Sequence, residues 1–139
     1  MSYEGDLTPV EAWEFLKANE DAVLLDIRTD EEWNYVGMPD TNPIDRETHF
    51  VEWVTYPDHE PNPDFYPQLA AAGLEAGGHQ PILIICRGGV RSVAAATAMT
   101  EAGFSPVYNV LEGLEGPIGD DGHRGHSGWR AAGLPWYQL

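Results

Sequence analysis

The segment best suited to chemistry is a seven-residue run that begins with the one cysteine of the chain. Its residues are, in order, Cys86, Arg87, Gly88, Gly89, Val90, Arg91 and Ser92. Two adjacent glycines allow a tight backbone curl in which successive N–H groups point inward and hold an anion. A cysteine at the mouth of such a nest, beside two arginines, is expected to be a thiolate and a nucleophile. We therefore predict that Cys86 is catalytic and that the six residues after it bind the substrate.

The net charge of the chain makes this cluster more informative. The 139 residues include 23 acidic and 7 basic ones, which gives a net charge of −16. Two of the few basic residues, Arg87 and Arg91, nevertheless lie within five positions of Cys86. Affinity for nucleic acids or for anionic membranes comes from clustered lysines and arginines. We therefore expect no nucleic-acid partner and no membrane partner, and we interpret both arginines as ligands of a small anionic substrate.

Each feature of this run also has a purely structural interpretation. Cys86 alone is compatible with a small buried apolar residue at the end of a strand. Gly88 and Gly89 alone are compatible with an ordinary tight turn. The combination of both glycines, both arginines and a following helix favours an anion site.

The single cysteine also bears on the class of protein. One cysteine permits no intrachain disulfide, which excludes the small secreted proteins held by disulfides. Residues 1–7 have neither the basic nor the apolar stretch of a signal peptide. The longest apolar runs are four or five residues, too short to cross a bilayer. These patterns predict a soluble cytoplasmic protein with one domain over residues 1–139.

Short apolar stretches alternate with amphipathic segments along the chain. The predicted strands are 22–27, 81–86 and 107–111, with a further short strand at 43–45. The predicted helices start at the Thr-x-x-Glu capping boxes of Thr8 and Thr29, run from Asn62 toward Leu74, and cover 92–102. This alternation predicts an α/β fold with a mainly parallel central sheet flanked by helices. Cys86 then lies at the carboxyl end of a strand, where such sheets bind ligands.

The run from Cys86 to Ser92 resembles the active loop of the rhodanese (sulfurtransferase) family. The resemblance implies a three-layer rhodanese-like fold as a single-domain member, with a persulfide sulfur carried on Cys86. Asp26-Ile27-Arg28 followed by Glu32 resembles a second motif of that family. Leu111-Glu112-Gly113, followed by Trp129, Gly133 and Pro135, resembles the closing segment of the family.

Three departures from the family pattern are visible. Met38 stands where the family usually has a histidine, and residues 52–62 form a longer stretch than in minimal members. A polar insertion at roughly 117–128 precedes the closing segment, and we expect it to form a surface loop rather than a border of the active loop.

The remaining candidate side chains have simpler interpretations. Arg28 paired with a carboxylate is expected to orient the loop and a helix, which is a structural role for Asp26, Arg28 and Glu32. His123 and His126 have a spacing compatible with metal binding, but no second ligand pair accompanies them. We therefore expect no metal site.

Sulfur transfer is the function that these patterns favour. The resemblance implies that the Cys86 thiolate takes the sulfane sulfur of an anionic donor such as thiosulfate and passes it, as a persulfide, to a thiol or sulfur-carrier acceptor. This chemistry requires no cofactor. Two alternatives remain at this point: a non-catalytic rhodanese-like binding or regulatory module, and phosphatase or arsenate reductase chemistry. The phosphatase loop has its arginine six positions after the cysteine, where this chain has Ser92.

Overall fold

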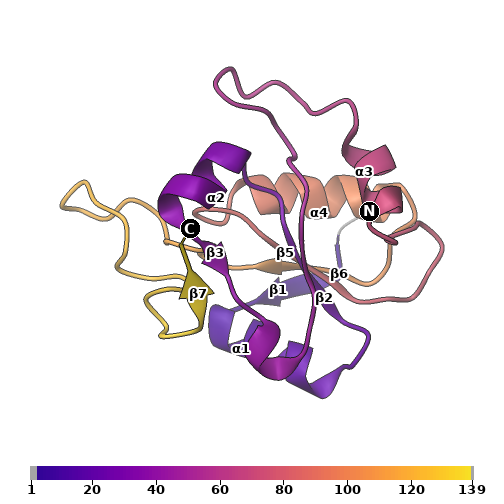
Figure 1. The fold of residues 1–139 in the computed structure, drawn as a ribbon, viewed down its shortest axis with the longest axis horizontal. Coiled ribbons are helices and arrows are strands. Elements are labelled where there is room, and N and C mark those ends of the chain that lie inside the picture. The colour runs from indigo at the N-terminus through magenta and orange to yellow at the C-terminus, as the bar shows by residue number, and fades with distance from the viewer. Residues whose placement is uncertain (1–2, 139) are drawn as a thin grey trace.

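A five-stranded parallel sheet organises residues 3–138, which are the residues that the computed structural model describes. Its strand order is β1-β6-β5-β2-β4, and every neighbouring pair is parallel. Figure 1 shows the sheet between α1 on one side and α4 on the other. The predicted α/β fold with a mainly parallel central sheet is confirmed.

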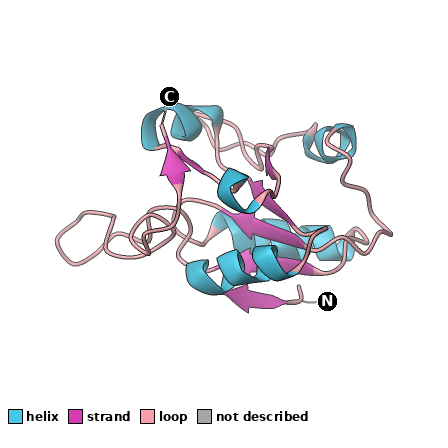
Figure 2. Cartoon of the chain, turned by 60° about the horizontal axis from the view of Figure 1, so that its bottom comes forward, coloured by secondary structure: helices cyan, strands magenta, loops and turns pink. Residues whose placement is uncertain are grey.

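The elements are short and close together in sequence. The strands are β1 (Gly5–Leu7), β2 (Val23–Asp26), β3 (Met38–Pro39), β4 (Thr48–Phe50), β5 (Ile82–Ile85), β6 (Val107–Val110) and β7 (Trp136–Tyr137). The helices are α1 (Pro9–Ala18), α2 (Asp30–Val36), α3 (Phe65–Ala71) and α4 (Arg91–Glu101). The two-residue strands β3 and β7 pair antiparallel outside the main sheet, so the end of the described chain lies beside α2, as Figure 2 also shows.

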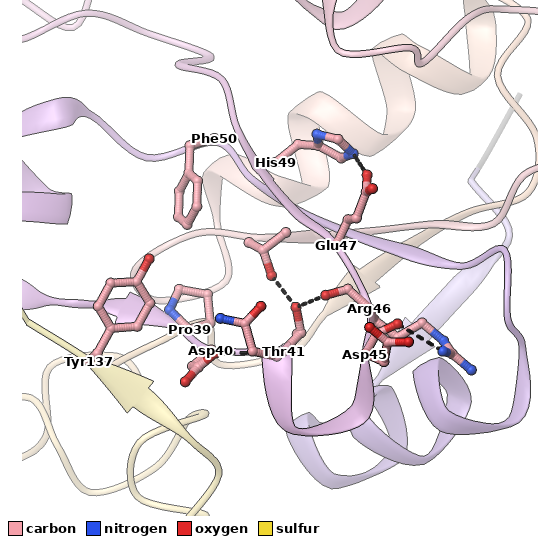
Figure 3. Close-up of a pocket in the computed structure, with 11 residues that line it drawn as sticks. Pro39, Asp40, Thr41, Asp45, Arg46, Glu47, His49, Phe50 and Tyr137 are labelled. Atoms are coloured by element: carbon pink, nitrogen blue, oxygen red, sulfur yellow. Dashed lines mark hydrogen bonds and ion pairs between the residues drawn. The ribbon is translucent and has the colours of Figure 1, made fainter.

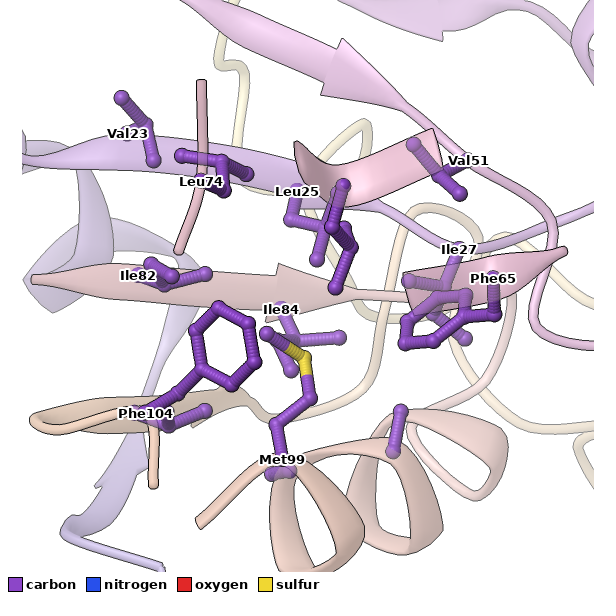
Figure 4. Close-up of a cluster of buried hydrophobic side chains, with 14 of the residues drawn as sticks. Val23, Leu25, Ile27, Val51, Phe65, Leu74, Ile82, Ile84, Met99 and Phe104 are labelled. Atoms are coloured by element: carbon purple, nitrogen blue, oxygen red, sulfur yellow. The ribbon is translucent and has the colours of Figure 1, made fainter. Parts of the chain in front are cut away.

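Two apolar layers hold the helices to the sheet because β2 and β5 are buried on both faces. On one face, α3 and α4 contribute Phe65, Leu69 and Met99; Figure 4 shows Met99 reaching toward Ile84 of β5. On the other face, α1 packs Leu16 beside the fully buried Trp129. Strands buried on both faces are typical of parallel sheets covered by helices, and they fix the carboxyl edge at which the site forms.

Short sequence signals determine where the first two helices begin. Thr8 and Thr29 each accept a hydrogen bond from the backbone N–H of the glutamate three residues later, and that glutamate bonds back to the threonine N–H. Both predicted capping boxes are therefore confirmed. The C-terminal segment also packs on the core as its tryptophans suggest, with Trp129 buried and Trp136 partly exposed.

Two predicted elements differ from the structure. The strand predicted at 43–45 is wrong: Asn42–Ile44 forms a short 3-10 helix, and the strand follows at Thr48–Phe50. Pro43 fits the first turn of a helix because its missing N–H is not needed there. The helix predicted from Asn62 begins later, at Phe65, because Asn62 Oδ1 accepts a hydrogen bond from the Asp64 N–H and residues 62–64 form a turn before the helix.

No helix within residues 3–138 has both the length and the apolar character needed to cross a bilayer.

Candidate functional site

Cys86 lies directly beyond the last residue of β5, in the middle of the carboxyl edge of the sheet. The neighbouring strands β2 and β6 end at the same edge, at Asp26 and Val110. The loop 86–90 then leads into α4, which begins at Arg91. This is the placement predicted from the sequence, and it brings the loops after β2 and β6 close to the cysteine.

The sulfur of Cys86 is held by two groups of its own loop and helix. The Gly89 N–H donates a hydrogen bond to Cys86 Sγ at 3.1 Å, and the Ser92 hydroxyl lies 3.2 Å from the same sulfur. Gly89 adopts φ +98°, a backbone conformation that favours glycine. Because a backbone N–H stabilises negative charge on its acceptor, this arrangement suits a thiolate or a persulfide.

Ser92 is a buried link between the sulfur and β6. Its hydroxyl donates to Asn109 Oδ1 at 2.5 Å, and Asn109 Nδ2 donates to Asp6 of β1 at 3.0 Å. Ser92 is fully buried and does not line the cavity at Cys86. Its hydroxyl therefore contacts the Cys86 sulfur and not the cavity, whereas the sequence predicts Ser92 among the substrate-binding residues.

The segment after β6 holds the start of the active loop through backbone hydrogen bonds. Leu114 N–H donates to the Cys86 carbonyl at 2.8 Å, and Glu115 N–H donates to the Arg87 carbonyl at 3.0 Å. Gly113, at φ +63°, allows this approach: a Cβ there would overlap the carbonyl oxygens of Cys86 and Arg87. The Leu-Glu-Gly motif thus supports the active loop through its backbone.

Arg91 ties the end of the loop to α2. Its Nη1 and Nη2 donate to the two carboxylate oxygens of Glu32 at 2.7 and 2.8 Å. Burial alone would raise the pKa of Glu32, but the hydrogen bonds and charge of Arg91, with the N–H and hydroxyl of Thr29, lower it to about 2. The same hydrogen bonds, which Arg91 donates to Glu32, raise the pKa of Arg91. The pair is therefore fully ionised at neutral pH.

A second ion pair, between Arg28 and Asp26, is completely buried. Arg28 Nη2 donates to Asp26 Oδ2 at 2.6 Å and to the Gly37 carbonyl at 2.7 Å. Neither side chain is exposed. The carboxylate partner expected for Arg28 is present as Asp26, and these contacts support the structural role predicted for Asp26, Arg28 and Glu32, which stays a prediction.

Arg87 is the more exposed of the two loop arginines. Its Nε donates to Glu115 Oε2, and its side chain is 39% exposed. Glu115 also lies 3.7 Å from Arg130. The sequence predicted both Arg87 and Arg91 as ligands of an anion; the structure gives each of them a glutamate partner within the protein.

A cavity of about 240 Å³ opens above Cys86. It is lined by Cys86, Arg87, Gly88, Val90, Arg91, Pro117, Ile118 and Arg124. The predicted residues Gly89 and Ser92 do not line it, and Val90 is mostly exposed. Cys86 itself is only 1% exposed, so the cavity is the route by which a small reactant reaches the sulfur.

The insertion at roughly 117–128 contributes three of those lining residues. The expectation that it is a surface loop away from the active loop is wrong in this respect, although most of the segment is exposed. In Figure 1 it is the orange-yellow loop that extends from the left of the molecule. The sequence does not single out Arg124 as a site residue; the one signal for it is that it is the single Lys or Arg in the polar segment 117–128.

A larger cavity of about 740 Å³ adjoins the first. Arg87, Arg91 and Arg124 line both, and Tyr35, Tyr56 and His59 line only the larger one. Tyr56 and His59 belong to the long stretch 52–62, so both long departures from the family pattern border the approach to Cys86.

Other features lie away from this site. A cavity of about 480 Å³ beside β4 is lined by Thr41, Glu47 and His49 among others, and none of its lining residues belongs to the active loop (Figure 3). Met38 is buried in β3, paired with Tyr137, and lines neither cavity at the loop. His126 Nε2 contacts the Asp121 carboxylate at 3.0 Å, and within residues 3–138 no three potential metal ligands meet.

The comparisons with known proteins agree with this geometry. The Rhodanese-like domain family matches residues 8–117, which include the active loop and the Asp26–Arg28 and Glu32–Arg91 ion pairs. The chain belongs to the rhodanese family. Among solved structures, this rhodanese is similar to Rv0390 from M. tuberculosis, with 47% identity, a TM-score of 0.89, and coverage of 99% of this chain and 100% of that one.

Two relatives with informative names are more distant. A protein named thiosulfate sulfurtransferase GlpE, from Actinobacillus succinogenes, is 27% identical over 94% of this rhodanese and 87% of its own length. The polysulfide-sulfur transferase homodimer of Wolinella succinogenes is 25% identical, with a TM-score of 0.64 and coverage of 96% of this chain and 78% of that one.

An uncharacterized protein of Rickettsia conorii is 31% identical over 94% of this chain and 95% of its own length.

Proposed function

We propose that this rhodanese is a sulfurtransferase that carries a sulfane sulfur as a persulfide on Cys86. The observation that carries the proposal is the Gly89 N–H bonded to Cys86 Sγ at the floor of a cavity edged by three arginines. The names of the Actinobacillus and Wolinella relatives support the same reaction class.

The first half-reaction needs no group besides the cysteine and the donor. The Cys86 thiolate attacks the outer sulfur of thiosulfate and forms an S–S bond. The S–S bond of the donor breaks, and sulfite leaves with its electron pair. No proton and no external oxidant are required, and the negative charge passes to the outer sulfur of the persulfide.

The second half-reaction restores the thiolate. A thiophilic acceptor, such as a thiolate or cyanide, attacks the outer sulfur, and the S–S bond to Cys86 breaks with its electrons returning to Sγ. Because the donor product leaves before the acceptor binds, the scheme is ping-pong.

The local structure suits an anionic reactant at this point. The two helices with capping boxes, α1 and α2, have their first N–H groups bonded to side chains, whereas α4 has no side-chain cap. The positive end of α4 therefore lies at the end of the active loop without a side-chain cap. Glu32 and Arg91 act as positioning residues, since their bidentate pair fixes the loop at the first turn of α4.

Phosphatase chemistry is less well supported by the loop. A phosphatase loop of this type places its arginine six positions after the cysteine, and here Arg91 is one residue early. Arg91 is also already held by Glu32 through both of its terminal nitrogens.

The test is the substitution Cys86→Ser. Wild-type protein incubated with thiosulfate is expected to gain the mass of one sulfur atom, which cyanide then removes as thiocyanate. Cys86→Ser is expected to show neither the mass gain nor thiocyanate production, because the chain has no other cysteine. Circular dichroism of both proteins controls for the fold, and intact mass spectrometry reads the modification.

Two results would contradict the proposal. Thiocyanate production by Cys86→Ser near the wild-type rate would exclude Cys86 as the carrier. Faster turnover of an aryl phosphate than of thiosulfate or polysulfide by wild type would favour the phosphatase alternative. A wild type inert to all of these would favour the non-catalytic module.

A further inference from the structure

The three arginines at the cavity differ in whether their charge is already balanced. Arg91 is paired with Glu32 through two hydrogen bonds, and Arg87 is paired with Glu115. Arg124 has no carboxylate partner within residues 3–138. Its Nη1 donates only to the Gly116 carbonyl, at 2.8 Å. Since a guanidinium has five N–H donors, Arg124 keeps both its net charge and unused donors.

The backbone holds the segment that carries Arg124 against the active loop. Gly125 N–H donates to the Glu115 carbonyl at 2.8 Å, and Gly128 N–H donates to Glu112 Oε1 at 3.3 Å. The Glu115 N–H in turn donates to the Arg87 carbonyl. Arg124 is therefore connected to the active loop through a continuous set of backbone hydrogen bonds.

Arg124 also lies directly over that loop. A Cβ at Gly88 would stand 2.7 Å from Arg124 Nη1, so the guanidinium packs against the bare backbone of Gly88. Arg124 lines the cavity that contains Cys86 and the larger cavity beside it. A reactant that passes from the larger cavity toward the sulfur therefore passes this side chain.

We infer that Arg124, supplied by the insertion, binds the oxyanion end of the sulfur donor and sets the preference of this rhodanese for anionic donors. The inference rests on the proposed sulfur transfer and assigns its substrate class. A donor with a terminal sulfonate or similar oxyanion places its sulfane sulfur toward Cys86 while its oxygens accept hydrogen bonds from Arg124. Arg87 and Arg91 then have mainly positioning roles, because glutamates neutralise them.

The experiment compares two alkylating agents of similar size at Cys86, anionic iodoacetate and neutral iodoacetamide. Four proteins are measured: wild type, Arg124→Ala, Arg124→Lys and His123→Ala. His123 is the matched control because it is exposed on the same segment and lines neither cavity. The ratio of the two rate constants isolates attraction of the anion, since any change in the reactivity of the sulfur affects both agents. kcat/KM for thiosulfate is measured on the same samples.

Arg124→Ala is expected to lower the iodoacetate-to-iodoacetamide ratio about three- to ten-fold and kcat/KM for thiosulfate about ten-fold. Arg124→Lys should recover most of the ratio, and His123→Ala should leave both values unchanged. A ratio for Arg124→Ala within about two-fold of wild type would overturn the inference while leaving sulfur transfer intact. If Cys86 of the wild-type protein accepts no sulfur, the proposed function is wrong. The assignment of a sulfur donor as the ligand of Arg124 is then wrong as well.

Discussion

At the scale of single residues, the positive charges of the arginines near Cys86 are partly neutralised by neighbouring glutamates. Arg87 lines the cavity above Cys86 and the larger cavity beside it, but its Nε is bonded to Glu115. Glu115 also lies 3.7 Å from Arg130, so one carboxylate reduces the positive charge of two arginines. An anionic donor that reaches Arg87 therefore competes with a glutamate already in place.

This competition predicts that Glu115→Gln raises activity with an anionic donor. The amide keeps a hydrogen-bond acceptor for Arg87 and removes one negative charge beside the cavity. At a partly exposed pair the gain is modest, so kcat/KM for thiosulfate is expected to rise about two- to five-fold. Steady-state kinetics at low ionic strength measures it.

The matched control for that variant is Glu14→Gln, which removes the same charge from an exposed position of α1. It should leave kcat/KM nearly unchanged. A fall in kcat/KM for Glu115→Gln would mean that the ion pair holds Arg87 in its working position, and the competition argument would then be wrong.

At the scale of elements, the Glu32–Arg91 pair joins α2 to the first turn of α4 across the mouth of the active loop. The folded protein lowers the pKa of Glu32 from 4.5 to about 2, so the native state favours the ionised carboxylate. A depressed carboxyl pKa contributes stability that is fully present above the unfolded value and is lost as the pH falls toward the folded value.

The pair is therefore expected to stabilise the fold at pH 7 and to lose that contribution between about pH 4.5 and pH 2. Glu32→Gln should lower the free energy of unfolding by about 1–2 kcal/mol at pH 7, after allowance for solvent screening, and by almost nothing near pH 2. Urea unfolding at a series of pH values measures this difference.

Glu31→Gln is the control on the same helix, because Glu31 has no ion pair within the described residues. Its effect should be small and nearly independent of pH. If Glu32→Gln destabilised the protein equally at pH 7 and pH 2.5, loss of packing rather than of charge would be the cause.

The same scale explains what the sequence could predict. The helix starts at Thr8 and Thr29 and the strand before Cys86 depend on residues a few positions apart, so the sequence alone predicts all three. Strands β1 and β4 have three residues each and little apolar pattern, so only their partners in the sheet define them.

Some features of the candidate site can likewise be predicted from the sequence, and others cannot. The placement of Cys86 followed from its strand, the glycines and the helix. The ion pairs of Arg87 and Arg91 join residues 28 and 59 positions apart, and local pattern does not encode such distances. The position of Arg124 depends on the close approach that Gly113 allows between two loops, which is visible only in three dimensions.

At the scale of the whole molecule, the net charge of −16 acts on stability as well as on partners. Charges of one sign repel one another more in the compact state than in the expanded chain, so the folded state is destabilised at low ionic strength. Raising the salt concentration from about 0.01 M to about 0.15 M shortens the screening length from about 30 Å to about 8 Å. Repulsion across the molecule is then largely removed, whereas the buried Asp26–Arg28 pair is little affected.

We therefore expect the melting temperature to rise by several degrees over this range of sodium chloride, because about 1 kcal/mol corresponds to roughly 3–6 °C for a chain of this size. Glu20→Lys, at an exposed acidic position next to Asp21, should raise the melting temperature at low salt, with most of the gain lost at 0.15 M. Glu20→Gln changes half as much charge and should give about half the effect. An equal gain at both salt concentrations would point to a local cause at the end of α1, and a melting temperature that does not respond to salt would show that the net charge does not limit stability.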